Sequence, residues 1–160
     1  MTNILFVCMA NRYRSPIAEA CFKAETTKRG EEENWHISSA GTWTKDGFPP
    51  MQDARTQAEK LGLDIQNHRS RVVSNEILDK ADLILVMEQG QKEALSNEYP
   101  QVKNKIYMLA EATIGISYNI PDPITHKNED SIPLEICDLI RKHYEKITAL
   151  LPSATQHPVG

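Results

Sequence analysis

The stretch Ile4-Leu5-Phe6-Val7-Cys8-Met9-Ala10-Asn11-Arg12-Tyr13-Arg14-Ser15-Pro16 decides the fold of this chain. Its first part is an apolar run, which predicts a strand over residues 3–8 that is buried on both faces. Its last part favours a helix start, with Ser15 as the N-cap and Pro16 at the first helical position. A strand, a short loop and a helix therefore follow one another, and the loop begins at the carboxyl end of the strand.

The chemistry of this loop rests on Cys8 and Arg14, which stand six positions apart, and on the adjacent Ser15. Backbone N–H groups of such a loop can surround one tetrahedral anion, with a thiolate beneath it and a guanidinium fork beside it. The helix start and the nearby arginine both stabilise the thiolate form of cysteine, which is the nucleophilic form. The pattern predicts a phosphate site with its own nucleophile. The loop residues expected to contact the substrate are Met9, Ala10, Asn11, Arg12 and Tyr13.

Each of these residues also has a plainer interpretation. A lone cysteine at the end of a strand is most often a small buried hydrophobic residue. An arginine in a loop often forms a surface ion pair. Ser15 is expected to cap the helix and to donate its hydroxyl to the sulfur of Cys8, and Asn11 to adopt a turn conformation with positive φ.

Strand and helix patterns alternate along the rest of the chain. Further strands are expected near 35–39, 82–87 and 105–109, and helices near 53–61, 74–80, 88–97 and 132–150. Such alternation predicts an α/β fold with a parallel sheet covered by helices on both faces. We expect a single domain over residues 1–152 and a flexible tail over 153–160. The stretch 110–130 has no regular pattern, and a loop of this length usually carries a function.

Composition excludes several classes of protein. With 160 residues and a formal net charge of −4, the chain has no general affinity for nucleic acid or for anionic membranes. No apolar run is long enough to span a bilayer, and we expect no signal peptide, because Met1-Thr2-Asn3 leads directly into the first predicted strand. The three cysteines, Cys8, Cys21 and Cys137, lack the spacing of a disulfide framework or a zinc site. We therefore expect free thiols, no metal and no cofactor, in a monomer located in the cytoplasm.

A phosphate ester requires a proton for its leaving oxygen, so a carboxylic acid is expected opposite the nucleophile. Asp122 is the favoured candidate, because Pro121 and Pro123 restrict its backbone on both sides. The alternative is an ordinary Asp-Pro turn. Asp46 and Asp53 also lie in or near loops, and spacing does not exclude them.

Two further residues have paired interpretations. His68, before Arg69-Ser70-Arg71, is either a general base or, more commonly for a lone histidine, a structural group. Trp43 either lines a substrate cleft or covers an edge of the core.

The residues resemble the low molecular weight protein tyrosine phosphatase family. The matching motifs run in family order and are Val7-Cys8-x2-Asn11-x2-Arg14-Ser15-Pro16-x-Ala18-Glu19-Ala20, Ser39-Ala40-Gly41-Thr42, Gly62 to Asp64, His68-Arg69-Ser70-Arg71, Ala81 to Glu88 and Asp122-Pro123. The resemblance implies a four-stranded parallel sheet in flavodoxin-like order, a doubly wound three-layer α/β/α fold with a phosphate-binding loop after the first strand.

The resemblance also implies roles for single residues. Cys8 would be the nucleophile, Arg14 the phosphate clamp and Asp122 the general acid, with no metal. Four residues would form the hydrogen-bond network that stiffens the loop, namely Asn11, Ser15, Ser39 and His68. The expected activity is hydrolysis of a phosphomonoester through a phosphocysteine intermediate, with a phosphorylated protein, or a small phosphomonoester, as substrate.

The loop departs from the family pattern at three positions. Ala10 stands in place of a glycine, Arg12 in place of a small or aliphatic residue, and Tyr13 in place of a second cysteine. We favour protein-tyrosine phosphatase activity, and a protein-arginine phosphatase would use the same three catalytic residues. An arsenate reductase is less consistent, because its thiol relay requires resolving cysteines. A module that binds phosphate or a phosphopeptide without turnover is the alternative from another class.

Overall fold

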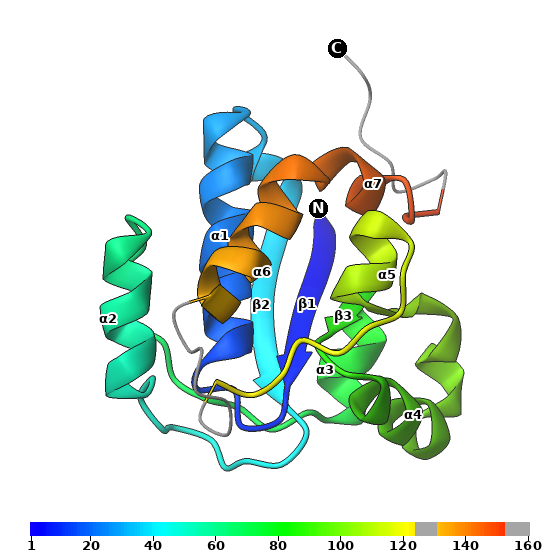
Figure 1. Ribbon diagram of the computed structural model, residues 1–160. Coiled ribbons are helices and arrows are strands. Elements are labelled where there is room, and N and C mark those ends of the chain that lie inside the picture. The colour runs from blue at the N-terminus through cyan, green and yellow to red at the C-terminus, as the bar shows by residue number, and fades with distance from the viewer. Residues whose placement is uncertain (124–130, 153–160) are drawn as a thin grey trace.

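A central parallel sheet organises the computed structural model, which describes residues 1–123 and 131–152. Its strands are β1 (Thr2–Cys8), β2 (Trp35–Gly41), β3 (Leu83–Val86) and β4 (Ile106–Met108). The spatial order is β2-β1-β3-β4, and every pairing is parallel. The predicted α/β fold with a four-stranded parallel sheet is therefore confirmed (Figure 1).

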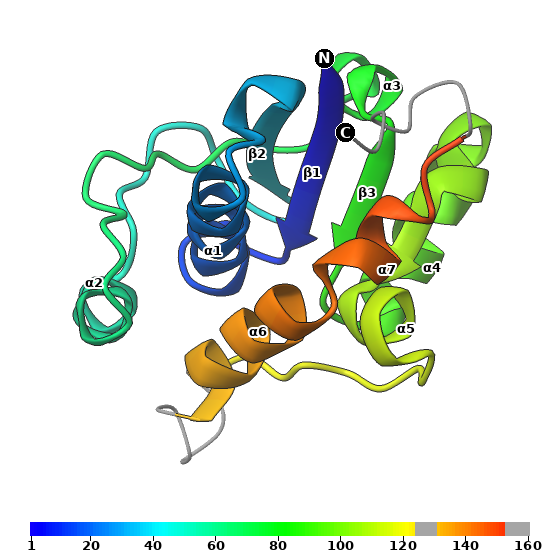
Figure 2. The same ribbon diagram turned by 90° about the horizontal axis from the view of Figure 1, so that it is seen from above.

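Helices cover both faces of this sheet, as Figure 2 shows with α1 and α6 on one side and α3 on the other. The helices of the described residues are α1 (Arg14–Lys28), α2 (Gln52–Lys60), α3 (Asn75–Lys80), α4 (Gln89–Glu98), α5 (Leu109–Ile114), α6 (Ser131–Lys142) and α7 (Tyr144–Thr148), with 3-10 turns η1 (Glu32–Asn34) and η2 (Pro100–Lys105). Parallel strands require crossover connections, and these helices supply them.

Alternation along β1 divides the core into two layers. Ile4, Phe6 and Cys8 belong to the buried cluster under α1, α5 and α6. Leu5 and Val7 belong to a second cluster, with residues of α3 and α4. Because successive side chains of a strand point to opposite faces, the apolar run 4–8 supplies both layers. This explains why the sequence of β1 is continuously hydrophobic.

The structure corrects three expectations about local structure. Ser15 is not the N-cap of α1: the helix begins at Arg14, and the hydroxyl of Ser15 is engaged by other side chains. Residues 110–114, expected within an irregular stretch, belong to α5, which begins at Leu109, because they are mostly good helix formers after a strand. The helix expected over 132–150 is divided into α6 and α7 at His143.

The expectation of three free thiols is also wrong in this structure. Cys21 of α1 and Cys137 of α6 are joined in a disulfide, with their Cα atoms 5.6 Å apart, and Cys8 is the one free cysteine. The two residues lie 116 positions apart in the sequence and are both buried, because α1 packs directly on α6. The bond ties the helix that follows the Cys8 loop to the helix that follows Asp122.

No helix in residues 1–123 and 131–152 is long and apolar enough to cross a membrane. The residues predicted as a flexible tail, 153–160, lie outside the described part of the chain, so that prediction stays untested.

Candidate active site

The loop from Cys8 to Arg14 connects the carboxyl end of β1 to the first turn of α1. A neighbouring segment supports its outer side, because Thr42 N donates to the Cys8 carbonyl at 3.0 Å and Trp43 N to the Met9 carbonyl at 2.9 Å. This close approach requires a glycine at position 41, where a Cβ atom would lie 2.6 Å from the Met9 carbonyl oxygen. The first part of the loop is thus held between β1 and the end of β2.

Cys8 lies at the base of this loop, 2% exposed. Its Sγ atom is 3.0 Å from the hydroxyl oxygen of Ser15, a residue in the first turn of α1. The positive end of α1 and the serine hydroxyl both face the sulfur, and both stabilise a negative charge there. The structure therefore places a single thiol at the anion-binding end of a helix.

Asn11 fixes the middle of the loop. Its φ of 58° is the one positive value of a non-glycine residue among the described residues. The side-chain amide donates to Ser15 Oγ at 2.7 Å and to Ser39 Oγ at 2.9 Å, and its Oδ1 accepts from Arg71 N at 3.0 Å. With both protons and its oxygen bonded and no exposed surface, this amide joins the loop to β2 and to the segment before α3.

Two residues at the edge of the network complete it. His68 Nε2 is 2.7 Å from the carbonyl oxygen of Asn11, which favours its structural interpretation over that of a general base. Ser39 Oγ donates to Glu19 Oε1 at 2.7 Å. The four residues predicted to stiffen the loop are thus brought together. Glu19 was not assigned a role from the sequence, although its position one helical turn after Ser15 on the same helix face was a usable signal.

Arg14 is buried, with a side chain 3% exposed, so it does not form a surface ion pair. Its NH1 nitrogen donates to the carbonyl oxygen of Ile120 at 2.8 Å and lies 3.0 Å from Oε2 of Glu88. Both of these contacts are made by NH1, one of the two terminal nitrogens of the guanidinium. Glu88 was missed as a partner, because nothing in its local sequence relates it to residue 14.

The contact at Ile120 also determines where Asp122 lies. Ile120 N donates to the Met87 carbonyl at 2.9 Å, while the Ile120 carbonyl accepts from Arg14, so this residue is held at the ends of β3 and of the Cys8 loop. Asp122, which is half-buried, is only two residues further along. The segment carrying the predicted acid therefore runs beside the predicted phosphate site.

Tyr118 anchors the same segment from its other end. Its hydroxyl donates to Glu135 Oε1 on α6 at 2.6 Å. Burial, followed by the hydrogen bond to Glu135 and then the charge of Glu135, raises the pKa of Tyr118 to about 12. Of the other candidate acids, Asp46 is exposed and accepts from Val72 N at 2.9 Å, and Asp53 is exposed at the start of α2.

The outer rim of the site is formed by Arg12 and the segment 42–48. Arg12 Nε donates to the Pro49 carbonyl at 2.8 Å, and its guanidinium lies 5.3 Å from the centre of the Phe48 ring. Trp43 is 82% exposed and lines a groove of about 560 Å³ beside Ala10 and Arg12, so it does not cover a core edge.

Met9 and Tyr13, two loop residues predicted to contact the substrate, differ in exposure: Met9 is exposed and Tyr13 is buried. Met9 is exposed, as a substrate contact requires. The Tyr13 side chain is 5% exposed and belongs to the same buried cluster as Cys8, so the prediction that it contacts the substrate stays a prediction.

Comparison with known proteins agrees with this geometry. The family model described as low molecular weight phosphotyrosine protein phosphatase matches residues 3–157. The chain belongs to this family. A low molecular weight protein-tyrosine-phosphatase of Acinetobacter johnsonii is 33% identical over 139 residues, which cover 84% of this chain and 92% of that protein.

Two further relatives of this phosphatase are named for different activities, one as an arginine and one as a tyrosine phosphatase. The protein-arginine-phosphatase of Bacillus subtilis is 29% identical over 121 residues, covering 76% of this chain and 79% of the relative. The crystal structure of a low molecular weight protein tyrosine phosphatase from T. tengcongensis superposes with a TM-score of 0.83 at 34% identity, over 91% of this chain and 99% of that one. Family members of both names are enzymes, and within the described residues of this chain no cluster of three or more His, Cys, Asp or Glu could hold a metal ion.

Replacing Asn11 tests whether its amide holds the loop. Asn11→Ala leaves buried polar groups without partners and places alanine in a left-handed conformation, so we expect a loss of about 3 kcal/mol in the free energy of unfolding. A loop displaced by about 1 Å should also lower kcat/KM for an aryl phosphate about 100-fold. Denaturant titration and steady-state kinetics measure the two effects.

Two matched variants separate the causes. Asn11→Gly tolerates the positive φ but lacks the amide, so it should recover part of the stability and little of the activity. Asn67→Ala, at an exposed position, should change the stability by less than about 0.5 kcal/mol. Full activity in Asn11→Ala would contradict the role given to the amide.

Proposed function

We propose that this phosphatase hydrolyses phosphomonoesters through a phosphocysteine at Cys8, and that its substrates are phosphotyrosine residues of proteins. The observation that carries the proposal is the 3.0 Å contact between Cys8 Sγ and Ser15 Oγ across a loop that is fixed by Asn11 and ends at the buried Arg14. A site that only binds phosphate has no use for a free thiol in this position.

The first chemical step uses Cys8 and Asp122. The thiolate sulfur attacks phosphorus, a P–S bond forms, and the bond from phosphorus to the tyrosine oxygen breaks with its electron pair on oxygen. Asp122 gives that oxygen its proton. The guanidinium of Arg14 and N–H groups of the loop backbone bind the three non-reacting oxygens, where the negative charge is concentrated.

The second step releases phosphate. The Asp122 carboxylate takes a proton from a water molecule whose oxygen attacks phosphorus. The P–S bond then breaks, and the sulfur leaves as a thiolate that accepts a hydrogen bond from Ser15. Inorganic phosphate departs, and Cys8 and protonated Asp122 are restored for another cycle.

The rim of the site favours phosphotyrosine over phosphoarginine. Arg12 is held over Phe48 and bonded to Pro49, so its positive charge is fixed at the mouth. The guanidinium of a phosphoarginine would meet this like charge, whereas a phosphotyrosine ring carries none. The exposed ring of Trp43 offers an aromatic surface beside the same mouth.

Further assignments follow from the same chemistry. A nucleophilic thiol must stay reduced, which supports a cytoplasmic location. The buried Cys21–Cys137 bond is shielded from small reductants and is compatible with that compartment. The apolar side chains close into two clusters within one chain, which supports a single domain over residues 1–152 and a monomer.

Asp122→Asn tests the proton donor. We expect kcat/KM to fall about 100-fold or more for phenyl phosphate, whose leaving oxygen needs a proton, and less than about tenfold for 2,4-dinitrophenyl phosphate, whose leaving group does not. Asp46→Asn is the matched control and should change neither value more than about twofold. Equal slowing of Asp122→Asn for both substrates would remove Asp122 from this role.

A substrate panel tests the specificity. The protein should hydrolyse a phosphotyrosine peptide with a higher kcat/KM than a phosphoarginine peptide of the same flanking sequence. Arg12→Met should shift this ratio toward phosphoarginine about fivefold, while Lys60→Met on α2, far from the loop in sequence, should leave it unchanged. A wild-type preference for phosphoarginine would overturn the tyrosine assignment and leave the chemistry of Cys8 in place.

A further inference from the structure

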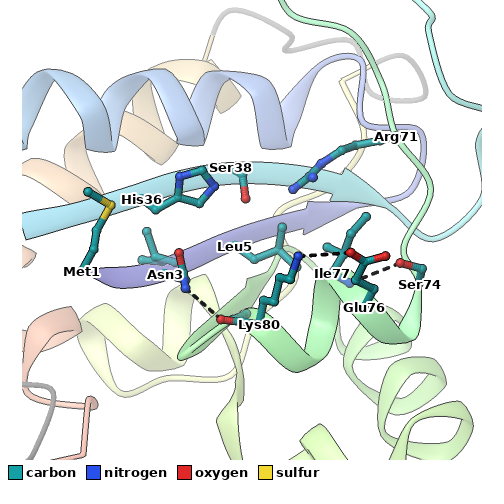
Figure 3. A pocket seen from close by; sticks show the side chains of 12 residues that line it. Met1, Asn3, Leu5, His36, Ser38, Arg71, Ser74, Glu76, Ile77 and Lys80 are labelled. Carbon is teal, nitrogen blue, oxygen red and sulfur yellow. Dashed lines mark hydrogen bonds and ion pairs between the residues drawn. The ribbon is translucent and has the colours of Figure 1, made fainter.

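A second cavity lies on the face of the sheet opposite α1, between β2 and α3 (Figure 3). It measures about 590 Å³, within the size range of small-molecule sites. It exists because α3 is only six residues long and leaves part of β2 without a covering helix. Of the β2 side chains on this face, Ala40 joins the buried cluster, whereas His36 is exposed and Ser38 is half-buried.

The residues that line this cavity are mainly basic, although the chain as a whole carries a net negative charge. Arg71 and Lys80 contribute two positive charges, His36 adds a third when protonated, and Glu76 is the one carboxylate among the residues that line it. Glu76 is already 3.1 Å from the Lys80 ammonium. A chain with a net charge of −4 thus carries a local positive site here, which attracts an anion.

Arg71 is fixed in place before any ligand arrives. Its Nε donates to the Ser39 carbonyl at 3.0 Å, and its backbone is bonded to Asn11 and to Gly41. Figure 3 shows its side chain extending along β2 toward Ser38, above the cavity. An arginine held in this way loses little conformational entropy when it binds an acidic group with its two terminal nitrogens.

The floor beneath these charges is apolar. Leu5 and Ala81 are buried at 2% and 4% exposure, and half-buried Ile77 stands beside them. Such a floor accepts a flat hydrocarbon body, which removes its surface from water. The cavity therefore combines one fixed guanidinium, a second cation and an apolar floor. Together they indicate a ligand that has both an acidic group and an apolar body.

We propose that the cavity between β2 and α3 is a second ligand site, separate from Cys8, for a small organic anion with an aromatic or other flat apolar body. The carboxylate, sulfonate or phosphate of the ligand pairs with Arg71 and Lys80, and its body lies on Leu5 and Ile77. The site lies on the face of the sheet opposite α1, and no nucleophilic cysteine lines it, so it binds and does not hydrolyse.

Amide chemical shifts locate the binding directly. The full chain, labelled with nitrogen-15, is titrated with naphthalene-2-sulfonate while orthovanadate occupies the Cys8 site. We expect saturable shifts at His36, Ser38, Ile77 and Lys80 that persist under orthovanadate. Shifts confined to residues 9–14, or lost when orthovanadate is added, would overturn the proposal.

Matched variants then test the chemistry of the ligand. The double variant His36→Glu and Lys80→Glu, at two exposed positions, should weaken naphthalene-2-sulfonate at least tenfold. Lys60→Glu with Lys103→Glu changes the net charge at least as much elsewhere on the surface and should alter the dissociation constant by less than twofold. Uncharged 2-hydroxymethylnaphthalene should bind at least tenfold more weakly than the sulfonate. Equal weakening in both double variants, or equal affinity for the uncharged compound, would contradict a site built for an anion.

Discussion

The amide of Asn11 is the interaction on which the rest of the site depends. One side chain bonds Ser15 on α1, Ser39 on β2 and the backbone of Arg71, so three segments distant in the sequence meet at a single group. Because the amide is fully buried, none of these bonds competes with water. The left-handed backbone at Asn11 turns the loop back toward α1, and this turn gives Cys8 and Ser15 their short contact.

Arg14 imposes a second constraint, because a buried guanidinium must be compensated. Glu88, at the start of α4, and the carbonyl of Ile120 supply that compensation. Removing the partner of a buried charge typically costs 3–5 kcal/mol, so buried Arg14 also holds the segment that leads to Asp122. The proposed clamp and the proposed proton donor are therefore coupled through folding: the contact that stabilises Arg14 brings Asp122 to the same edge of the sheet.

The sequence predicts those parts of the protein that depend on local pattern. The apolar run 4–8, the loop after it and the alternation of elements identify the sheet and the place of the site, since buried strands and crossover helices leave a periodic signal. Contacts between residues that are distant in the sequence leave no periodic signal. The bond between Cys21 and Cys137, the pairing of Glu88 with Arg14 and the burial of Tyr13 arise from packing alone. Ser15 matches a helix cap by residue type, but the sulfur of Cys8 and the amide of Asn11 engage its hydroxyl first.

The central claim is that Cys8 carries the phosphoryl group during turnover. Rapid acid quenching of the protein with a phosphorus-32-labelled aryl phosphate, followed by peptide mapping, tests it most directly. The account predicts a burst approaching one phosphoryl group per chain, located on the peptide that contains Cys8, and no burst and no turnover in Cys8→Ala. Steady turnover in Cys8→Ala, or label located on any other residue, would contradict it.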